Sequence, residues 1–177
     1  MLDVGCGTGT LLQVLSAASP SVKLSGVDPS PEMLGIAHAK LGCSAELKPG
    51  YAEKLPFRDE TFDIVASTST FHYLRRPKHA LREIARVLKP RGEIVITDWC
   101  ADYLTCYVCD RLLCWFNRAH VKTHGRDECQ RLLEESGFQS VDVDRYRINW
   151  LWGLMTARAQ KFTTQTVART KQSPVSL

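Results

Sequence analysis

The sequence predicts an α/β protein with a doubly wound, mainly parallel sheet of seven strands. Short apolar runs typical of buried strands alternate with segments whose apolar residues recur at helical spacing, as far as about residue 137. Three glycines at alternate positions, Gly5, Gly7 and Gly9, follow the first run and predict a sharp turn into a helix. In such a sheet, ligands bind beyond the carboxyl ends of the strands, so this turn marks the expected site.

Each expected element has a local reason. Strands are predicted where apolar runs are bounded by turn residues, and helices where apolar residues follow i, i+3, i+4 spacing. Ser30 and Pro31 are typical of a helix N-cap and first turn, and the run Lys89–Gly92 is typical of a helix end. The predicted elements are the strands 2–4, 23–28, 45–48, 62–67, 93–99, 140–146 and 149–157, and the helices 10–19, 30–41, 77–88, 101–118 and 126–136.

The composition is that of an ordinary soluble globular domain, with 44% apolar and 24% charged residues in 177. No apolar run reaches the roughly 18–20 residues that a membrane span needs. The first residues show neither a basic leader nor an apolar export signal. We therefore expect a cytoplasmic protein whose seven cysteines are reduced thiols.

The net charge of +4 is unevenly placed, because six basic and no acidic residues follow Asp144. Basic residues spread in this way do not resemble a nucleic-acid groove, so we expect no nucleic-acid partner. We expect one domain over residues 1–159, in which residues 100–124 form an insertion over the substrate site. Residues 160–177 are expected to be a polar, basic and flexible tail.

The spacing of the glycines narrows the choice of cofactor. Dinucleotide sites use G-x-G-x-x-G, whereas Thr10 stands after Gly9 here, and the chain has no G-x-x-x-x-G-K-[ST] loop for phosphates. Asp28 ends the second predicted strand, where a carboxylate suits the two hydroxyls of a ribose and would repel a 2′-phosphate. The pattern therefore excludes a P-loop and disfavours nucleotide-sugar or NAD chemistry, which is kept as a third hypothesis.

Residues Leu2–Gly9 resemble the first motif of class I S-adenosylmethionine-dependent methyltransferases almost letter for letter. The chain is similar to the small-molecule (methyltransferase type 11-like) subgroup over about residues 2–138. The resemblance implies a Rossmann-like sheet with strand order 3-2-1-4-5-7-6, S-adenosyl-L-methionine as cofactor, and a small-molecule acceptor. The further blocks that carry it are Val27–Ser30, Met33–Leu34, Gly50–Phe57, Phe62–Val65 and Glu83–Gly92.

The resemblance also implies roles for residues of this chain. Asp28 would bind the ribose hydroxyls, the backbone of Ala52 would meet the adenine edge, and Ser67 would face the methionine end. Asp3 would hold the glycine loop or, through water, the cofactor ammonium. The full set implied to bind the cofactor is Asp3, Gly5, Cys6, Gly7, Gly9, Asp28, Pro29, Met33, Tyr51, Ala52, Glu53 and Ser67.

Three features depart from the family pattern. Tyr51 stands where the subgroup often has an aspartate, so adenine recognition would rest on stacking, on Glu53 or on the backbone. Arg91 replaces a common glycine in the turn before the fifth strand. Family members usually carry a helix before the first strand that covers the cofactor, and we expect this N-terminal covering helix to be missing.

Methyl transfer from a sulfonium is an in-line displacement that needs a base only if the acceptor must lose a proton. His72, just past the fourth strand, is the leading candidate for this base, and Asp98 at the end of the fifth strand is a second candidate. Local packing of His72 and a turn or cap role for Asp98 are the alternatives. Side chains expected to contact the substrate are His72, Tyr73, Trp99, Tyr103 and Tyr107.

The cysteines of the insertion invite a metal interpretation that the spacing does not favour. Cys106 and Cys109 form a single C-x-x-C pair, so we expect packing and no metal site. The same holds for Cys100, Cys114, His120 and His124. The run Ser67–Phe71 also lacks the [DN]-P-P-[FYW] motif of nucleic-acid amino-methyltransferases.

Together these observations predict an S-adenosylmethionine-dependent methyltransferase that acts on a small, apolar or aromatic acceptor. The alternative is a cofactor-binding, catalytically weak methyltransferase-like subunit that serves a partner. The aromatic helix 101–118 would shape the acceptor site or, alternatively, fill the core or a homodimer interface.

Overall fold

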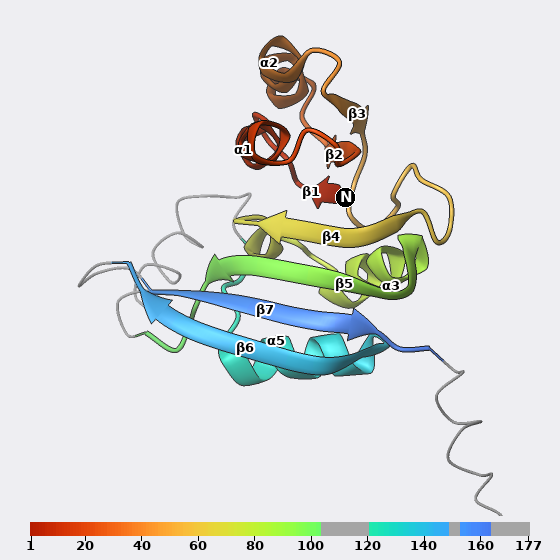
Figure 1. The fold of residues 1–177 in the computed structure, drawn as a ribbon. Coiled ribbons are helices and arrows are strands. Elements are labelled where there is room, and N and C mark those ends of the chain that lie inside the picture. Colours follow the sequence, from red (N-terminus) through yellow and green to blue (C-terminus); the bar gives the residue numbers. More distant parts are fainter. Residues whose placement is uncertain (104–120, 149–152, 164–177) are drawn as a thin grey trace, which may run out of the picture.

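The computed structural model describes residues 1–103, 121–148 and 153–163 of the chain. Its strands form one seven-stranded sheet in the order β3-β2-β1-β4-β5-β7-β6, which confirms the predicted fold (Figure 1). The strands are β1 Leu2–Val4, β2 Leu24–Asp28, β3 Ala45–Pro49, β4 Phe62–Thr68, β5 Leu88–Trp99, β6 Phe138–Arg147 and β7 Gly153–Lys161. The helices are α1 Thr10–Ala18, α2 Pro31–Leu41, the 3₁₀ turn η1 Phe71–Tyr73, α3 Pro77–Val87 and α5 Arg126–Glu135.

The sheet is parallel from β3 to β5, and β7 runs antiparallel to both of its neighbours. Every residue of β1 and β2 is buried, as expected for central strands of a parallel sheet that is covered on both faces. β6, at the edge, buries only Phe138 and Val143, and its last four residues are all exposed. Strand β1 lies between β2 and β4, so the chain reverses its winding direction at β1.

The helices pack on the sheet through two apolar clusters. Leu12 of α1 and Leu34, Ala37 and Leu41 of α2 form one cluster with Leu24. The other cluster joins the buried faces of α3 and α5 to β4, β5, β6 and β7. In Figure 1, α1 and α2 lie over the β1–β3 end of the sheet, and α3 and α5 lie behind the other strands.

Helix α2 begins as the sequence predicts. The hydroxyl of Ser30 accepts a hydrogen bond from Met33 N at 3.2 Å, and Pro31 occupies the first turn.

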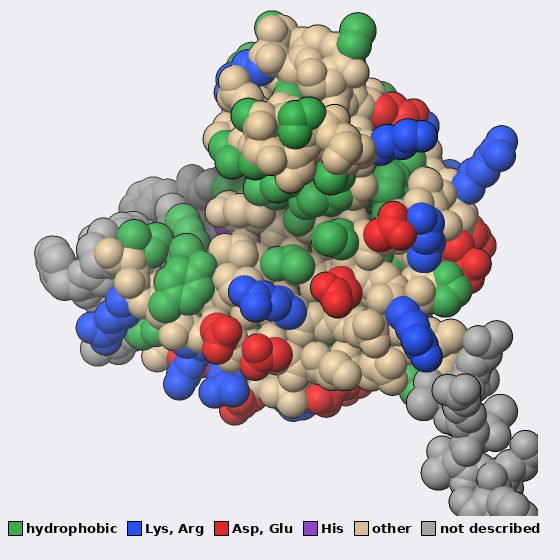
Figure 2. Space-filling model, in the orientation of Figure 1, with side chains coloured by type: hydrophobic (Ala, Val, Ile, Leu, Met, Phe, Trp, Pro, Cys, Tyr) green, Lys and Arg blue, Asp and Glu red, His purple; other side chains and the backbone are tan. Residues whose placement is uncertain are grey.

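No described helix is long and apolar enough to cross a membrane. Figure 2 shows apolar side chains gathered below α1 and α2, with charged side chains scattered over the strands farther from these helices.

The described strands and α-helices lie within two residues of their predicted bounds except β5 and β7. β5 begins at Leu88 rather than at Glu93, because the Lys89–Gly92 turn is a bulge within the strand that shifts its pairing with β4. β7 continues to Lys161, and Phe162 N donates to Gly137 O at 2.9 Å. The first residues assigned to the flexible tail are therefore part of the sheet.

The reason for the second difference is local. Met155, Ala157 and Ala159 alternate on the buried face of β7, but alanine has little strand preference and hides the period of two in the sequence. Most of the predicted 101–118 helix, with Tyr107, Cys106, Cys109 and Cys114, lies outside the described residues, as do His120 and residues 164–177.

Candidate functional site

The predicted site residues gather at the carboxyl ends of β1, β2, β4 and β5. The glycine loop leaves β1, Asp28 ends β2, Ser67 lies one residue before the end of β4, and Asp98 one residue before the end of β5. Since β1 is the strand at which the winding reverses, its carboxyl end is the place where ligands bind in sheets of this kind.

The glycine loop is built from left-handed backbone. Gly5, Gly7 and Gly9 have φ angles of 75°, 51° and 74°, a region that favours glycine. A Cβ at Gly5 would collide with the side chain of Thr70, whereas a Cβ at Gly7 would meet no atom within 4 Å. Gly7 therefore faces open space, and it is the loop glycine against which a ligand could lie.

Gly9 serves helix packing rather than the ligand. A Cβ at Gly9 would lie 2.8 Å from Leu41 Cδ1 and 3.1 Å from Ala37 Cβ, both on α2. Gly9 N donates to Cys6 O at 2.9 Å, which closes the turn into α1. The three glycines that read as one motif in the sequence thus meet three different surroundings.

Asp28 is fixed by backbone donors on both of its oxygens. Gly7 N donates to Oδ2 at 2.8 Å, and Ser30 N donates to Oδ1 at 2.9 Å. Each oxygen of an ionised carboxylate can accept a further hydrogen bond, so the two can receive a pair of adjacent hydroxyls. The tie between Gly7 and Asp28 also couples the glycine loop to the end of β2.

Asp3 is the most unusual carboxyl group of the site. It is 2% exposed, and its Oδ1 has no hydrogen-bond partner among the described residues. Burial, and secondarily the charge of Asp28, raises the pKa of Asp3 to about 7. A cation bound nearby would favour the ionised form, so this buried oxygen suits the ammonium of the methionine moiety.

The neighbouring Cys6 has no sign of redox reactivity. Burial, and then the charges of Asp3 and Asp28, raises the pKa of the Cys6 thiol to about 12. A thiol that stays protonated at neutral pH is a poor nucleophile, so Cys6 is a packing residue of the loop.

The loop 50–57, predicted to meet the adenine, lies against the end of β2. Gly50 N donates to Asp28 O at 3.2 Å, and Ala52 is buried. Tyr51 is 67% exposed and Glu53 half-buried, so both remain accessible at the rim of the site. Pro29 and Met33 are also exposed, beside Asp28 at the start of α2.

His72 and Asp98 form a buried pair. Nδ1 of His72 lies 2.7 Å from Oδ1 of Asp98, and His72 N donates to Oδ2 at 3.0 Å. Trp99 N also donates to Oδ1 at 2.7 Å, so three N–H groups converge on this carboxylate. An acceptor-only carboxylate requires the proton on Nδ1, which leaves Nε2 as the nitrogen with an acceptor lone pair.

Aromatic side chains surround this pair. The ring of Trp99 stacks on His72 at 5.1 Å between centroids with an interplanar angle of 12°, and Tyr73 lies 4.0 Å from His72 on the same measure. Tyr103 is packed beside Arg147 at 5.1 Å. His72 itself is only 3% exposed, so the pair is buried beneath the surface.

The segment between β4 and η1 links the two halves of the site. Thr70 Oγ1 donates toward Gly5 O at 3.2 Å and Thr68 O at 3.1 Å. Ser67 is 2% exposed, and its hydroxyl has no hydrogen-bond partner among the described residues. A buried hydroxyl of this kind can form a hydrogen bond with a bound ligand.

Sequence reasoning gave Thr70, Glu83 and Arg86 no role in the site. Thr70 covers Gly5, while Glu83 and Arg86 bind the loop 50–57 from α3. The only local signal for the last two is their i, i+3 spacing, which predicts an ion pair but not its target. In the described part of the chain, no three His, Cys, Asp or Glu side chains cluster as metal ligands.

Comparisons with known proteins agree with this architecture. A family model described as a methyltransferase domain matches residues 2–96. A demethylmenaquinone methyltransferase of Staphylococcus aureus is 31% identical over 167 residues, which cover 80% of this chain and 68% of that protein. Another from Thermotoga maritima is 36% identical over 98 residues, covering 55% of this chain and 42% of that protein.

Solved structures share the fold. A methyltransferase candidate from Haloferax volcanii, solved in complex with the Trm112 methyltransferase activator, matches with a TM-score of 0.81 and 21% identity, over 92% of this chain and 82% of that chain. The chain spans only about two fifths of the length of several curated relatives that it matches. The family match covers more than half of the chain, and the chain belongs to the S-adenosylmethionine-dependent methyltransferases with a class I, Rossmann-like domain.

Proposed function

We propose that this protein transfers a methyl group from S-adenosylmethionine to a small acceptor that carries a hydroxylated aromatic ring. The observation that carries the proposal is the buried His72–Asp98 pair, stacked on Trp99 and joined to the glycine loop through Thr70. This pair supports a base and an aromatic surface at the ends of β4 and β5, beside the residues that would hold the cofactor.

The residues present fit the cofactor that the family uses. Asp28 would accept the two ribose hydroxyls, Gly7 would lie against the ligand, and Asp3 would balance the ammonium. The unpartnered Oδ1 of Asp3 and the open space at Gly7 support this assignment. When bound, the cofactor would supply an electrophilic methyl group on a sulfonium. The leaving group is a neutral thioether, which needs no acid to leave.

His72 would act as the general base. With Nδ1–H donated to Asp98, Nε2 accepts the proton of the acceptor hydroxyl, and the carboxylate stabilises the imidazolium that results. The electron pair freed on the oxygen would delocalise into the ring and make the adjacent ring carbon nucleophilic. Once methylated, that carbon would lose its proton to water, which restores the aromatic ring, and the imidazolium would return its proton to the oxygen. A base of this kind contributes about 10²–10⁴ in rate.

The names of relatives favour a ring acceptor. Two of them, from Staphylococcus aureus and Thermotoga maritima, are named demethylmenaquinone methyltransferases. The surroundings of His72 match such a substrate chemically, because Trp99 and Tyr73 offer flat apolar surface next to a base. We therefore assign a naphthoquinol-type ring as the first acceptor to test, with methylation at carbon.

The test combines binding and turnover. Calorimetry with S-adenosylmethionine, S-adenosylhomocysteine and NAD should show binding of the first two only. Turnover with a panel of hydroxylated aromatic acceptors, followed by mass spectrometry, should add one methyl group. Binding of NAD alone would overturn the proposal. Cofactor binding without turnover on any acceptor would favour the alternative, a catalytically weak subunit that serves a partner.

A further inference from the structure

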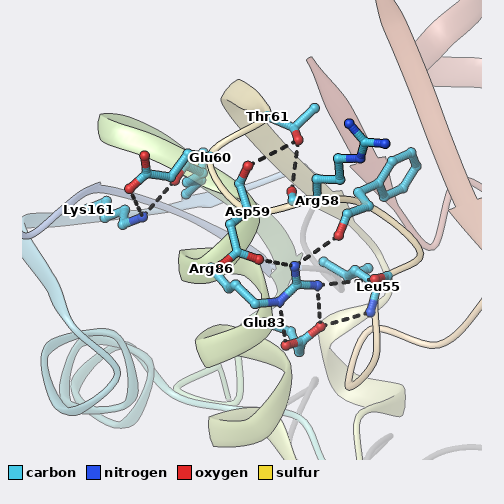
Figure 3. Close-up of polar contacts among 10 residues, drawn as sticks. Leu55, Arg58, Asp59, Glu60, Thr61, Glu83, Arg86 and Lys161 are labelled. Carbon is cyan, nitrogen blue, oxygen red and sulfur yellow. Dashed lines mark hydrogen bonds and ion pairs between the residues drawn. The ribbon is translucent and has the colours of Figure 1, made fainter.

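We propose that Arg86, oriented by Glu83, is a positioning residue that holds loop 50–57 in the shape that receives the base of the cofactor. The inference rests on the proposed function and names a part of the cofactor site that lies outside its binding motifs. Both residues belong to α3 and bind the backbone of Leu55 in this loop (Figure 3).

The position of the loop makes it the neighbour of the base. Loop 50–57 begins where β3 ends, and Gly50 N donates to the backbone oxygen of Asp28. The side chain of Asp28 is the proposed ribose ligand. Since a base is joined to its ribose by one bond, it must lie beside the segments adjacent to Asp28, and this loop is one of them.

Helix α3 grips the far part of the loop at its backbone. Leu55 N donates to Glu83 Oε2 at 3.0 Å, and Leu55 O accepts from Arg86 Nη2 at 3.1 Å. Arg86 Nη1 donates to Phe57 O at 2.9 Å. Both polar backbone groups of Leu55 and the carbonyl of Phe57 are therefore fixed by two side chains one helical turn apart.

The guanidinium of Arg86 is fully used. Besides the two loop carbonyls, it donates to Glu83 from Nε and Nη2, each at 2.8 Å, and to Asp59 Oδ1 from Nη1 at 2.7 Å. These five bonds match the five N–H donors of arginine. Lysine has a single nitrogen and cannot hold two carbonyls and a carboxylate in one plane.

Packing explains why the loop needs this attachment. Leu55 is 4% exposed and joins the core, and Phe57 packs edge-on against Phe62 with ring centroids 5.0 Å apart. Ala52, whose backbone would meet the base, lies between Leu55 and Gly50, which is itself bound to Asp28 O. A loop held rigid before binding spares the ligand the cost of ordering it, so the attachment raises affinity without touching the ligand.

The positions of Glu83 and Arg86 also predict which kinetic constant changes when Arg86 is replaced. His72 and Asp98 lie at the ends of β4 and β5, and none of the contacts of Arg86 involves them. Loss of Arg86 should therefore raise the KM for S-adenosylmethionine and leave kcat at saturating cofactor nearly unchanged. It should also reduce the preference for adenine over other bases, because the loop backbone that would bind the base is no longer fixed.

The experiment uses Arg86→Met and Arg86→Lys, with Lys78→Met as the matched control. Lys78 lies on the same helix, and its ion pair, at 2.6 Å, is with Glu135 of α5 rather than with loop 50–57. Calorimetry with S-adenosylhomocysteine and S-inosylhomocysteine measures affinity and the preference for adenine over hypoxanthine. Initial rates with S-adenosylmethionine separate KM from kcat.

We expect Arg86→Met to weaken S-adenosylhomocysteine binding by about 10- to 100-fold and to narrow the preference for adenine. Arg86→Lys should recover part of both, and Lys78→Met should match the wild type. A folded Arg86→Met protein, judged by circular dichroism and melting, that keeps its affinity within two-fold and its base preference would overturn the inference.

Three further outcomes also decide between the inference and the proposed function. If Arg86→Met does not fold, Arg86→Lys and Glu83→Gln carry the test with the same expected direction, and unchanged affinity in both would overturn the inference. Wild-type protein that binds neither ligand would overturn the proposed function and this inference with it. Wild-type binding with unaffected variants would overturn this inference alone.

Discussion

Nδ1 of His72 lies 2.7 Å from Oδ1 of Asp98, and both side chains are almost completely buried. The pair joins η1, which follows β4, to the end of β5, and two backbone N–H groups complete the carboxylate's hydrogen bonds. This arrangement fixes the ring of His72 and directs Nε2 away from Asp98. It is the arrangement that a positioned general base requires.

Asp98→Asn tests this role with little change in shape. The amide no longer offers a charged acceptor to Nδ1–H, so the base should lose both its orientation and the stabilisation of its protonated form. We expect kcat to fall by about 10²–10⁴ with a ring acceptor, as measured by initial rates at saturating cofactor. His72→Gln should give a loss of similar size, and S-adenosylhomocysteine affinity should stay near that of the wild type. Full activity in either variant would contradict the assignment.

Asp28→Asn should weaken cofactor binding. The side chain would keep one acceptor oxygen, but it would lose the charge that Gly7 N, Ser30 N and the ribose hydroxyls share. Hydrogen bonds to charged groups are worth about 1.5–3 kcal/mol, so we expect a rise of about 10- to 100-fold in the Kd for S-adenosylhomocysteine, measured by calorimetry. Glu46→Gln, an exposed carboxylate on β3, is the control. An unchanged Kd for Asp28→Asn would contradict the proposal that Asp28 binds the ribose hydroxyls.

The raised pKa of Asp3 predicts that the stability of the protein depends on pH. Its pKa is raised from an ordinary 3.8 to about 7 in the folded protein, mainly by burial and then by Asp28. Between about pH 4 and 7 the folded state holds a proton that the unfolded state releases, so this group lowers stability as the pH rises through that window. The full deficit, at most about 4 kcal/mol, is present above pH 7.

Asp3→Asn removes that titration. The variant should melt at a higher temperature than the wild type at pH 8 and at nearly the same temperature at pH 4, as followed by circular dichroism in the absence of ligand. A difference in melting temperature that does not vary with pH would show that Asp3 is not the titrating group.

Gly7→Ala and Gly9→Ala separate ligand contact from packing. Both positions have left-handed φ angles, so both alanines carry backbone strain. At Gly9 the methyl group also meets Leu41 and Ala37, which should add about 1–3 kcal/mol of overpacking. We expect Gly9→Ala to lower the melting temperature more, and Gly7→Ala to weaken S-adenosylhomocysteine binding more. The reverse order would contradict the geometry.

The sequence by itself determined the fold class, the strand order through its ordered family motifs, and the region in which we propose the cofactor site. These features have local causes. The glycine spacing imposes left-handed backbone at residues 5, 7 and 9, and the apolar periods identify the strands and helices. The end of β7 escaped prediction because its alternating alanines carry a weak strand signal.

Only the tertiary structure decided which side chains meet. His72 and Asp98 are 26 positions apart, Thr70 and Gly5 are 65 apart, and no local pattern pairs them. Their contacts follow from the register of β4 on β5 and of β1 on β4, which the whole sheet sets. The attachment of loop 50–57 to Arg86 likewise exists only because α3 packs beneath the strand that follows the loop.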